Sequence, residues 1–403
     1  MSPALHAFLC HRGNALALVR QEEGLQARLL EASLLLCSRD RRDFERAGWV
    51  YAAVKDVRSP HVAALGAAVD GDYPRASRIY DQILADDPGD LLALAVANVF
   101  DYYLGNPQAR RTASALEAQP DHHAVLSMHA FALEEVGEYG EAEALARRAL
   151  ELEPLDLRAH HAVSHVLEMQ GRLHEGVRWM GARSTWWSEA GPASTHLWWH
   201  LALYHLELGH PGHALAIYDR RMQGEALSEL IDASALLWRL HLRSWDVGSR
   251  FKTLAARWSP YAGDAHCAFN DLHAMMAFVA AGRWDCARRL LAAQERRVRI
   301  PWGANRDMTR LVGLPACRAL AAFGRGDYAG AERLLRALPP VAHRIGGSHA
   351  QRDVLQLTRF AAANRGQSPK RNRGQSPDQN RGQSPMGLRE WGLLGPAIPQ
   401  ASR

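Results

Sequence analysis

A short pattern that recurs roughly every 34 residues constrains the fold of this chain more than any other feature. A typical copy reads Gly71-x-Tyr73-x-x-Ala76: a glycine, a bulky residue two positions on and a small residue at plus five. The turn positions of the copies fall at 71, 105, 137, 171, 209, 243, 282 and 326, with intervals of 32 to 44 residues. A period of this length is typical of helix–turn–helix units, which cannot bury their apolar faces alone and therefore stack on one another.

The residue types of the pattern suit such a unit. The small residue at plus five lets two antiparallel helices approach closely, and the bulky residue at plus two packs across the pair. Prolines near plus seventeen, such as Pro88 and Pro154, end the second helix. The pattern resembles the tetratricopeptide repeat. We therefore predict an all-α, tetratricopeptide-like helix-hairpin solenoid of about eight helix pairs, spanning residues 57–364.

The two ends of the chain differ from this array. Residues 1–56 are helical in pattern but hold no full repeat, which predicts an N-terminal helical cap. Residues 365–403 form a low-complexity tail, in which Arg365-Gly366-Gln367-Ser368-Pro369 recurs at 373–377 and 381–385. So few apolar residues cannot offset the entropy cost of ordering, and the tail is predicted to be disordered.

Charge and cysteine content bear on partners and compartment. The net charge of +5 comes from 48 basic and 43 acidic residues that are intermixed along the chain, so we predict no nucleic-acid partner. The five cysteines form no CxxC pair, and their odd number indicates a reducing, cytoplasmic setting. The apolar runs Ala15–Val19 and Leu34–Cys37 are too short for a signal peptide or a membrane span, so no membrane partner is expected.

Several segments carry a closer resemblance. HHAVSHVLEM at 160–169 is one of them, and the others are 196–219, 269–276, 312–320 and 346–354. Together they resemble the family named tetratricopeptide repeat protein 38, over roughly residues 58–360. The resemblance implies a helical-repeat fold and a soluble intracellular protein, and it implies no particular activity.

Histidines dominate the candidate functional residues. In arrays that look like tetratricopeptide repeats, the first helix of each pair lines a concave groove, at positions about 13, 10, 9, 6 and 3 before the turn glycine. Six chemically active side chains fall at such positions before Gly171, Gly209 and Gly282: His161, His165, Glu168, His196, His200 and His273. The offsets predict that all six face one groove.

Two functions remain open for this groove. It presents histidine and tryptophan side chains that can bond to or stack on a protein segment or a small ligand. The alternative is an enzyme or metalloprotein, because imidazole suits zinc, iron, nickel or copper and also serves acid–base chemistry near neutral pH. The sequence alone assigns no metal ligand, catalytic residue or cofactor.

Five further residues are candidates for the groove: Asn270, Asp271, Gln351, Arg352 and Asp353. The first two neighbour His273, although Asp271 could instead bond to its own helix. The other three follow Gly346-Gly347-Ser348, where Ser348 and Gln351 fit a capping box and the arginine could hold a carboxylate or a phosphate. No GxxxxGK[ST], GxSxG or HExxH motif accompanies them, so any chemistry rests on the histidines.

Overall fold

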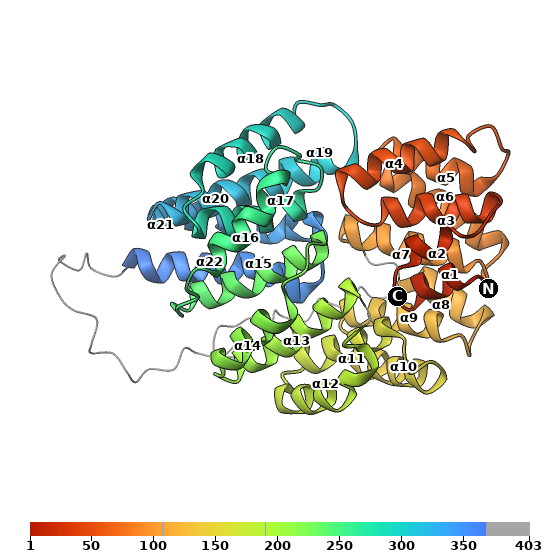
Figure 1. The fold of residues 1–403 in the computed structure, drawn as a ribbon, viewed down its shortest axis with the longest axis horizontal. Helices are drawn as coiled ribbons and strands as arrows, with labels where there is room; N and C mark the ends of the chain where they lie inside the picture. Colours follow the sequence, from red (N-terminus) through yellow and green to blue (C-terminus); the bar gives the residue numbers. More distant parts are fainter. Residues whose placement is uncertain (107–108, 190, 368–403) are drawn as a thin grey trace, which may run out of the picture.

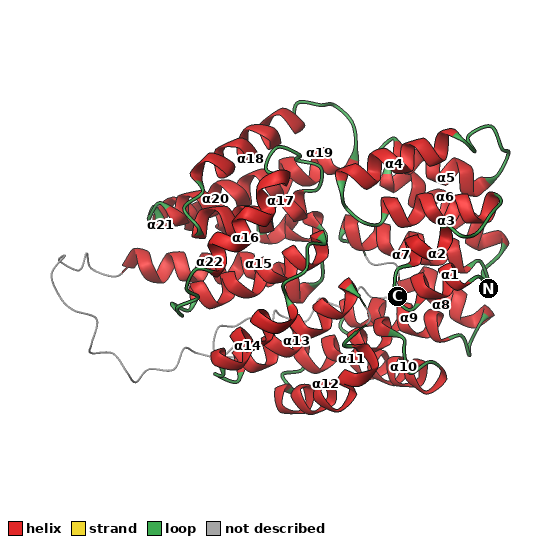
Figure 2. Ribbon diagram, viewed as in Figure 1, coloured by secondary structure: helices red, strands yellow, loops and turns green. Residues whose placement is uncertain are grey.

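The computed structural model describes residues 1–106, 109–189 and 191–367. Within these ranges the chain forms 22 α-helices with a few short 3-10 and π-helical turns, and no β-strand (Figure 2). None of these helices is long and apolar enough to cross a membrane.

Sixteen of the helices form eight consecutive hairpins, which confirms the predicted solenoid. The pairs are α5 (Pro60–Val69) and α6 (Tyr73–Asp86), α7 (Leu91–Leu104) and α8 (Ala109–Ala118), α9 (His123–Glu135) and α10 (Tyr139–Leu152), α11 (Leu157–Met169) and α12 (Leu173–Trp187), α13 (Pro192–Glu207) and α14 (Pro211–Arg221), α15 (Leu227–Leu242) and α16 (Arg250–Trp258), α17 (Ala268–Ala280) and α18 (Trp284–Arg297), and α20 (Leu314–Gly324) and α21 (Tyr328–Arg336).

The turn positions of the sequence pattern join the two helices of each pair. Seven of them are glycines with φ between 64° and 89°, the left-handed region that glycine enters without strain. In the remaining hairpin, Ser244 takes this conformation directly after Arg243. In six of the eight hairpins the residue at plus five is small and buried, and at Gly176 a Cβ atom would lie 2.5 Å from the ring of Tyr204.

Six helices lie outside the hairpins. They are α1 (Pro3–Leu9), α2 (Ala15–Val19), α3 (Leu25–Leu36), α4 (Arg41–Ala52), α19 (Ala304–Met308) and α22 (His349–Gln367), with the 3-10 segment η3 (Pro339–Ile345) before the last. Since α22 ends at Gln367, the first three residues of the predicted tail are helical, and the rest of 365–403 lies outside the described residues.

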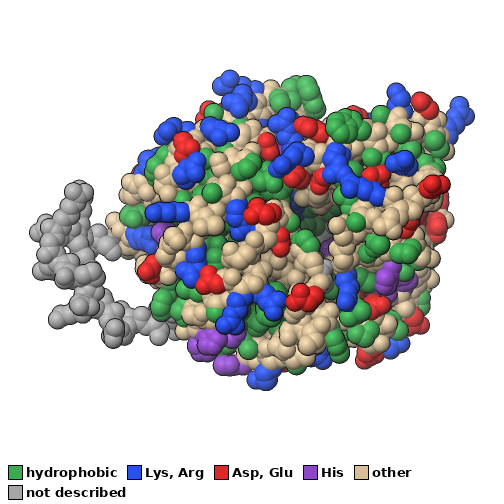
Figure 3. Space-filling model, viewed as in Figure 1, with side chains coloured by type: hydrophobic (Ala, Val, Ile, Leu, Met, Phe, Trp, Pro, Cys, Tyr) green, Lys and Arg blue, Asp and Glu red, His purple; other side chains and the backbone are tan. Residues whose placement is uncertain are grey.

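The array closes on itself (Figure 1). One lobe holds α15 to α22, the other holds α1 to α8, and α9 to α14 connect them along one side. On the opposite side the lobes touch, where the Ala304 amide donates to the Gly71 carbonyl at 2.9 Å. The space-filling view shows a hollow between the lobes (Figure 3). The concave face is therefore an enclosed interior rather than an open groove.

The chain's own N-terminal residues reach into this interior. The Leu157 amide donates to the Cys10 carbonyl at 3.0 Å, and Arg158 Nε donates to the Leu9 carbonyl at 2.9 Å. Further along, the Arg39 guanidinium lies over the rings of three aromatic residues from both lobes: Tyr102, Tyr103 and Phe269. Leu9, Cys10 and Arg39 thus contact hairpins beyond the first one, while α3 packs against α5 of the first hairpin.

Candidate metal centre

Four imidazoles from the neighbouring helices α11 and α13 meet in the interior. They belong to His161, His165, His196 and His200, which we call the imidazole centre. One ring nitrogen from each lies within 4.8 Å of the other three. The shortest separation joins Nε2 of His161 to Nε2 of His196 at 3.1 Å. Two ring nitrogens this close share either a proton or a metal ion.

Carboxylates lie behind three of the four rings. At His196 and His200 the carboxylate lies within hydrogen-bond distance of Nδ1, which favours a proton on Nδ1 and leaves the Nε2 lone pair for the centre. The Glu134 contact to His165 is longer and is not a hydrogen bond. The three pairs are His196 with Asp232 at 2.9 Å, His200 with Glu168 at 2.8 Å and His165 with Glu134 at 3.4 Å. Histidines that bind metal ions in proteins are held in this way.

Two of the central nitrogens have no hydrogen-bond partner. Nε2 of His165 and Nε2 of His200 are buried, and both side chains are 0% exposed. A buried polar atom without a partner costs free energy, and a bound ion would satisfy both nitrogens together. His196 is 22% exposed, so the centre can be reached from that side.

The electrostatics favour the uncharged form of two of the four imidazoles. Burial, reinforced by the neighbouring imidazoles, lowers the pKa of His161 and of His200 well below the usual value. Burial also opposes protonation of His165, but the Glu134 carboxylate outweighs it and raises the pKa of that ring. Neutral imidazole is the form that binds metal ions.

Burial shifts the pKa of the acid at the centre in the opposite direction and favours its protonated, neutral form. Burial raises the pKa of Glu168 to about 8, against the effect of His165. Both carboxylate oxygens of Glu134 are buried without a hydrogen-bond partner. A divalent cation among the imidazoles would favour the ionised form of these acids, because it supplies the charge that burial takes from solvent.

The predicted residues on α17 do not join the centre. His273 is fully buried, and its Nδ1 bonds to the Phe269 carbonyl of its own helix at 2.8 Å. Burial lowers the pKa of this imidazole to about 3. Asn270 donates to the carbonyl of Arg39 at 3.0 Å, and Asp271 accepts from Gln294 Nε2 at 3.0 Å. These three side chains therefore serve three separate contacts.

The predicted residues on α22 hold that helix to the others. Gln351 Oε1 accepts from the Ser348 amide at 3.2 Å, which is the side-chain half of the predicted capping box, and it also accepts from the hydroxyl of Tyr102. Arg352 does hold a carboxylate, that of Glu135 in α9, at 3.3 Å. The Asp353 carboxylate pairs with Arg239 of α15.

Sequence reasoning missed two of the carboxylates. Glu134 stands three residues before Gly137, the same offset that marked Glu168 before Gly171, so the repeat pattern held a signal for it. Asp232 stands eleven residues before the turn at Arg243, which is not one of the groove offsets. Only the packing of α13 against α15 brings it to His196.

Comparison with known proteins adds little to this geometry. No family model matches the chain. A chain of the APC/C hetero-tetramer Cut9–Hcn1 is similar at 13% identity and a TM-score of 0.38, over 85% of this chain and 65% of that one. Human IFIT1, in a dimer with PPP-AAAA, is similar at 14% identity and a TM-score of 0.38, over 84% of this chain and 91% of that one.

The chain thus spans less than two thirds of the Cut9–Hcn1 chain that it matches. Both likenesses are too remote to carry an argument about ligands or partners. The assignment to a tetratricopeptide-like helical repeat stands on the eight hairpins and their turns.

Proposed function

We propose that this helical-repeat protein binds a divalent transition-metal ion at His161, His165, His196 and His200. The observation that carries the proposal is the convergence of four ring nitrogens within 4.8 Å, three of them on rings backed by carboxylates. In a tetrahedral site with metal–nitrogen bonds of about 2.0–2.1 Å, neighbouring nitrogens lie roughly 3.3 Å apart. Small side-chain rotations are enough to reach that spacing, and an all-imidazole set suits zinc, copper, iron or nickel.

The closure of the array favours an ion or a small molecule over a protein segment. Arg39 and the first turn of α22 cover the interior face with their own contacts, where an extended peptide would have to lie. The partly exposed His161 and His196 leave one approach to the centre. A small molecule that enters there could reach the bound ion.

The resemblance to tetratricopeptide repeat protein 38 bears on the same residues. Its segments 160–169 and 196–219 contain all four imidazoles and Glu168. If the resemblance reflects common descent, relatives should keep these five residues together, with acids at the positions of Glu134 and Asp232.

Metal analysis of the purified full-length chain tests the proposal. We expect a tightly held zinc-type ion in the wild type, and one ion fewer per chain in the double variant His165→Gln, His200→Gln. The matched control is His210→Ala, His213→Ala, which removes exposed rings of the surface cluster that they form with His205 and leaves the interior intact. The same metal content in the interior variant and in the wild type would overturn the proposal.

A further inference from the structure

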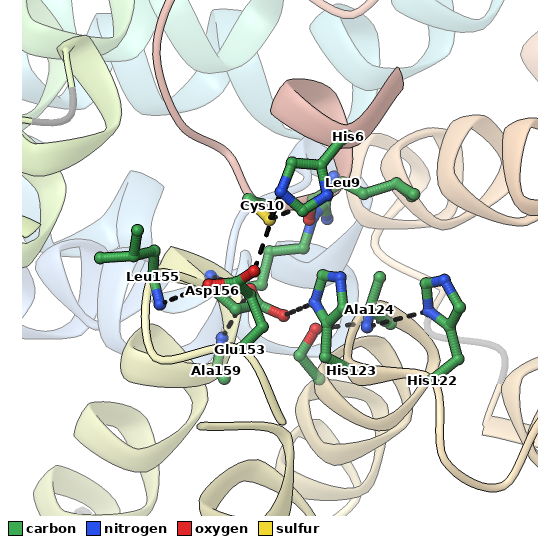
Figure 4. Close-up of polar contacts among 12 residues, drawn as sticks. His6, Leu9, Cys10, His122, His123, Ala124, Glu153, Leu155, Asp156 and Ala159 are labelled. Carbon is green, nitrogen blue, oxygen red and sulfur yellow. Dashed lines mark hydrogen bonds and ion pairs between the residues drawn. The ribbon is translucent and has the colours of Figure 1, made fainter. Parts of the chain in front are cut away.

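A second group of metal-ligating side chains lies where α1 meets α9 and the end of α10 (Figure 4). It consists of His6, Cys10, His123 and Glu153, which we call the N-terminal cluster. The Cys10 sulfur lies 3.7 Å from Nε2 of His6, which in turn lies 3.8 Å from Oε2 of Glu153. One nitrogen from each histidine and the Cys10 sulfur all lie within 4.8 Å of one another.

His123 is oriented toward this cluster by Asp156. Its Nδ1 lies 2.9 Å from Oδ2 of that carboxylate, which is fully buried. The other oxygen of Asp156 accepts from the amides of Arg158 and Ala159 at the start of α11, so the carboxylate is fixed in place. Nε2 of His123 is left buried and without a hydrogen-bond partner. A histidine with its Nδ1 on a carboxylate and its Nε2 free is prepared to bind a metal ion.

The backbone that carries Cys10 is also fixed. Its carbonyl accepts from the Leu157 amide at 3.0 Å, and the preceding carbonyl of Leu9 accepts from Arg158 Nε at 2.9 Å. The sulfur therefore has a set position against the start of α11, although it comes from the first helix of the chain. His6 is one helical turn before it on the same face of α1.

We propose that His6, Cys10 and His123 bind a zinc ion, with Glu153 as the fourth ligand, and that this ion fastens the N-terminal helix to the middle of the array. One thiolate, two imidazoles and a carboxylate are the ligand types that zinc takes in tetrahedral sites. With zinc–sulfur and zinc–nitrogen bonds of about 2.3 and 2.0 Å, the sulfur and a nitrogen lie roughly 3.6 Å apart, close to the separation of Cys10 and His6. Binding releases the thiol proton of Cys10 to solvent.

This cluster shares no residue with the imidazole centre, so the two can be tested separately. Cobalt(II) titration of the full-length protein reports on it, because a thiolate–cobalt bond gives a near-ultraviolet charge-transfer band that imidazole ligands do not. We expect the band in the wild type and in Cys37→Ser, which removes another thiol of the N-terminal region. We expect no band in Cys10→Ser.

Two further variants retain all the cysteines. They show whether loss of the band in Cys10→Ser comes from loss of a ligand or from misfolding. His123→Gln should weaken cobalt and zinc binding at this cluster at least ~10-fold, and Glu153→Gln should weaken it less. Native mass spectrometry should then show one zinc ion fewer in Cys10→Ser than in the wild type. A band that persists in Cys10→Ser, a wild type without the band, or unchanged affinity in His123→Gln would each overturn the inference.

Discussion

The imidazole centre and the closing seam of the ring are held by different kinds of contact. We call one set of contacts the closing seam. These are the contacts that residues 36–44 and the η3–α22 segment make with α7, α9 and α17. In the centre, His161 and His196 are 35 residues apart, one repeat along the chain. In the seam, Tyr102 meets Gln351 across 249 residues, and Asn270 meets Arg39 across 231. Stacking of neighbouring hairpins is enough to form the first, whereas the second requires the whole array to be in place.

The largest expected effect falls on the seam. Gly105→Ala places a methyl group 1.7 Å from the carbonyl oxygen of His343, in a backbone conformation with φ at 64°. The clashing His343 oxygen belongs to the backbone and cannot rotate away as a side chain could. We therefore expect the free energy of unfolding to fall by roughly 3–5 kcal/mol. Gly137→Ala is the control, since its φ of 89° is also positive but no atom lies within 4 Å of the added Cβ, and it should cost only ~1–2 kcal/mol. Urea unfolding followed by circular dichroism measures both, and equal losses would contradict the closure of the ring.

A second pair of variants tests packing between neighbouring hairpins. Gly176→Ala pushes a Cβ to 2.5 Å from the Tyr204 ring, whose hydroxyl is anchored by donation to the Ser164 carbonyl at 2.6 Å. We expect a loss of about 2–3 kcal/mol. Gly181→Ala lies in the same helix with open space around it, so it should gain ~0.5–1 kcal/mol. The same urea titration reports both, and a shift of the same sign in the two variants would show that α12 does not pack on α13 as described.

A third prediction concerns the pH dependence of stability and tests a buried acid on α17, outside the imidazole centre. Burial raises the pKa of Asp271 to about 7, so the folded protein holds this proton more tightly than the unfolded chain does. The contribution of Asp271 to the free energy of unfolding should therefore fall as the pH rises from about 4 to about 7 and level off above that. Asp271→Asn lacks this proton and, after the cost of burying an amide, should gain ~1–2 kcal/mol at pH 8 and nothing at pH 4. Thermal melts across this pH range would reject the account if the gain were equal at both ends.

The smallest expected effect sharpens the description of the seam. Arg39→Lys keeps the charge but loses the flat guanidinium that lies 4.1 Å from the Tyr103 ring centroid, so we expect a loss of about 1 kcal/mol. Arg42→Lys is the control, because that guanidinium lies over Tyr261 with its side chain 62% exposed. Its unfolding midpoint in urea should barely move. An equal shift for both would mean that Arg39 does not join the two lobes.

The same contrast explains what the sequence could predict. The period of the turn glycines gave the hairpins, and the offsets from Gly171 and Gly209 selected the four imidazoles that meet. The repeat pattern could also have given Glu134. It could not predict that Arg39 contacts aromatic rings of both lobes, or that Cys10 approaches His123. These residues meet only when the ring closes and the N-terminal helix crosses it, and no periodic relation connects them.

X-ray absorption at the zinc edge tests the central claim most directly. The sample is the full-length variant Cys10→Ser, His210→Ala, His213→Ala, loaded with one equivalent of zinc, in which the N-terminal cluster lacks its thiolate and the surface cluster lacks two of its rings. We predict a first shell of four nitrogens at about 2.0–2.1 Å with the outer-shell scattering of imidazole rings. A first shell dominated by oxygen, or zinc lost on desalting, would contradict a metal centre in the interior.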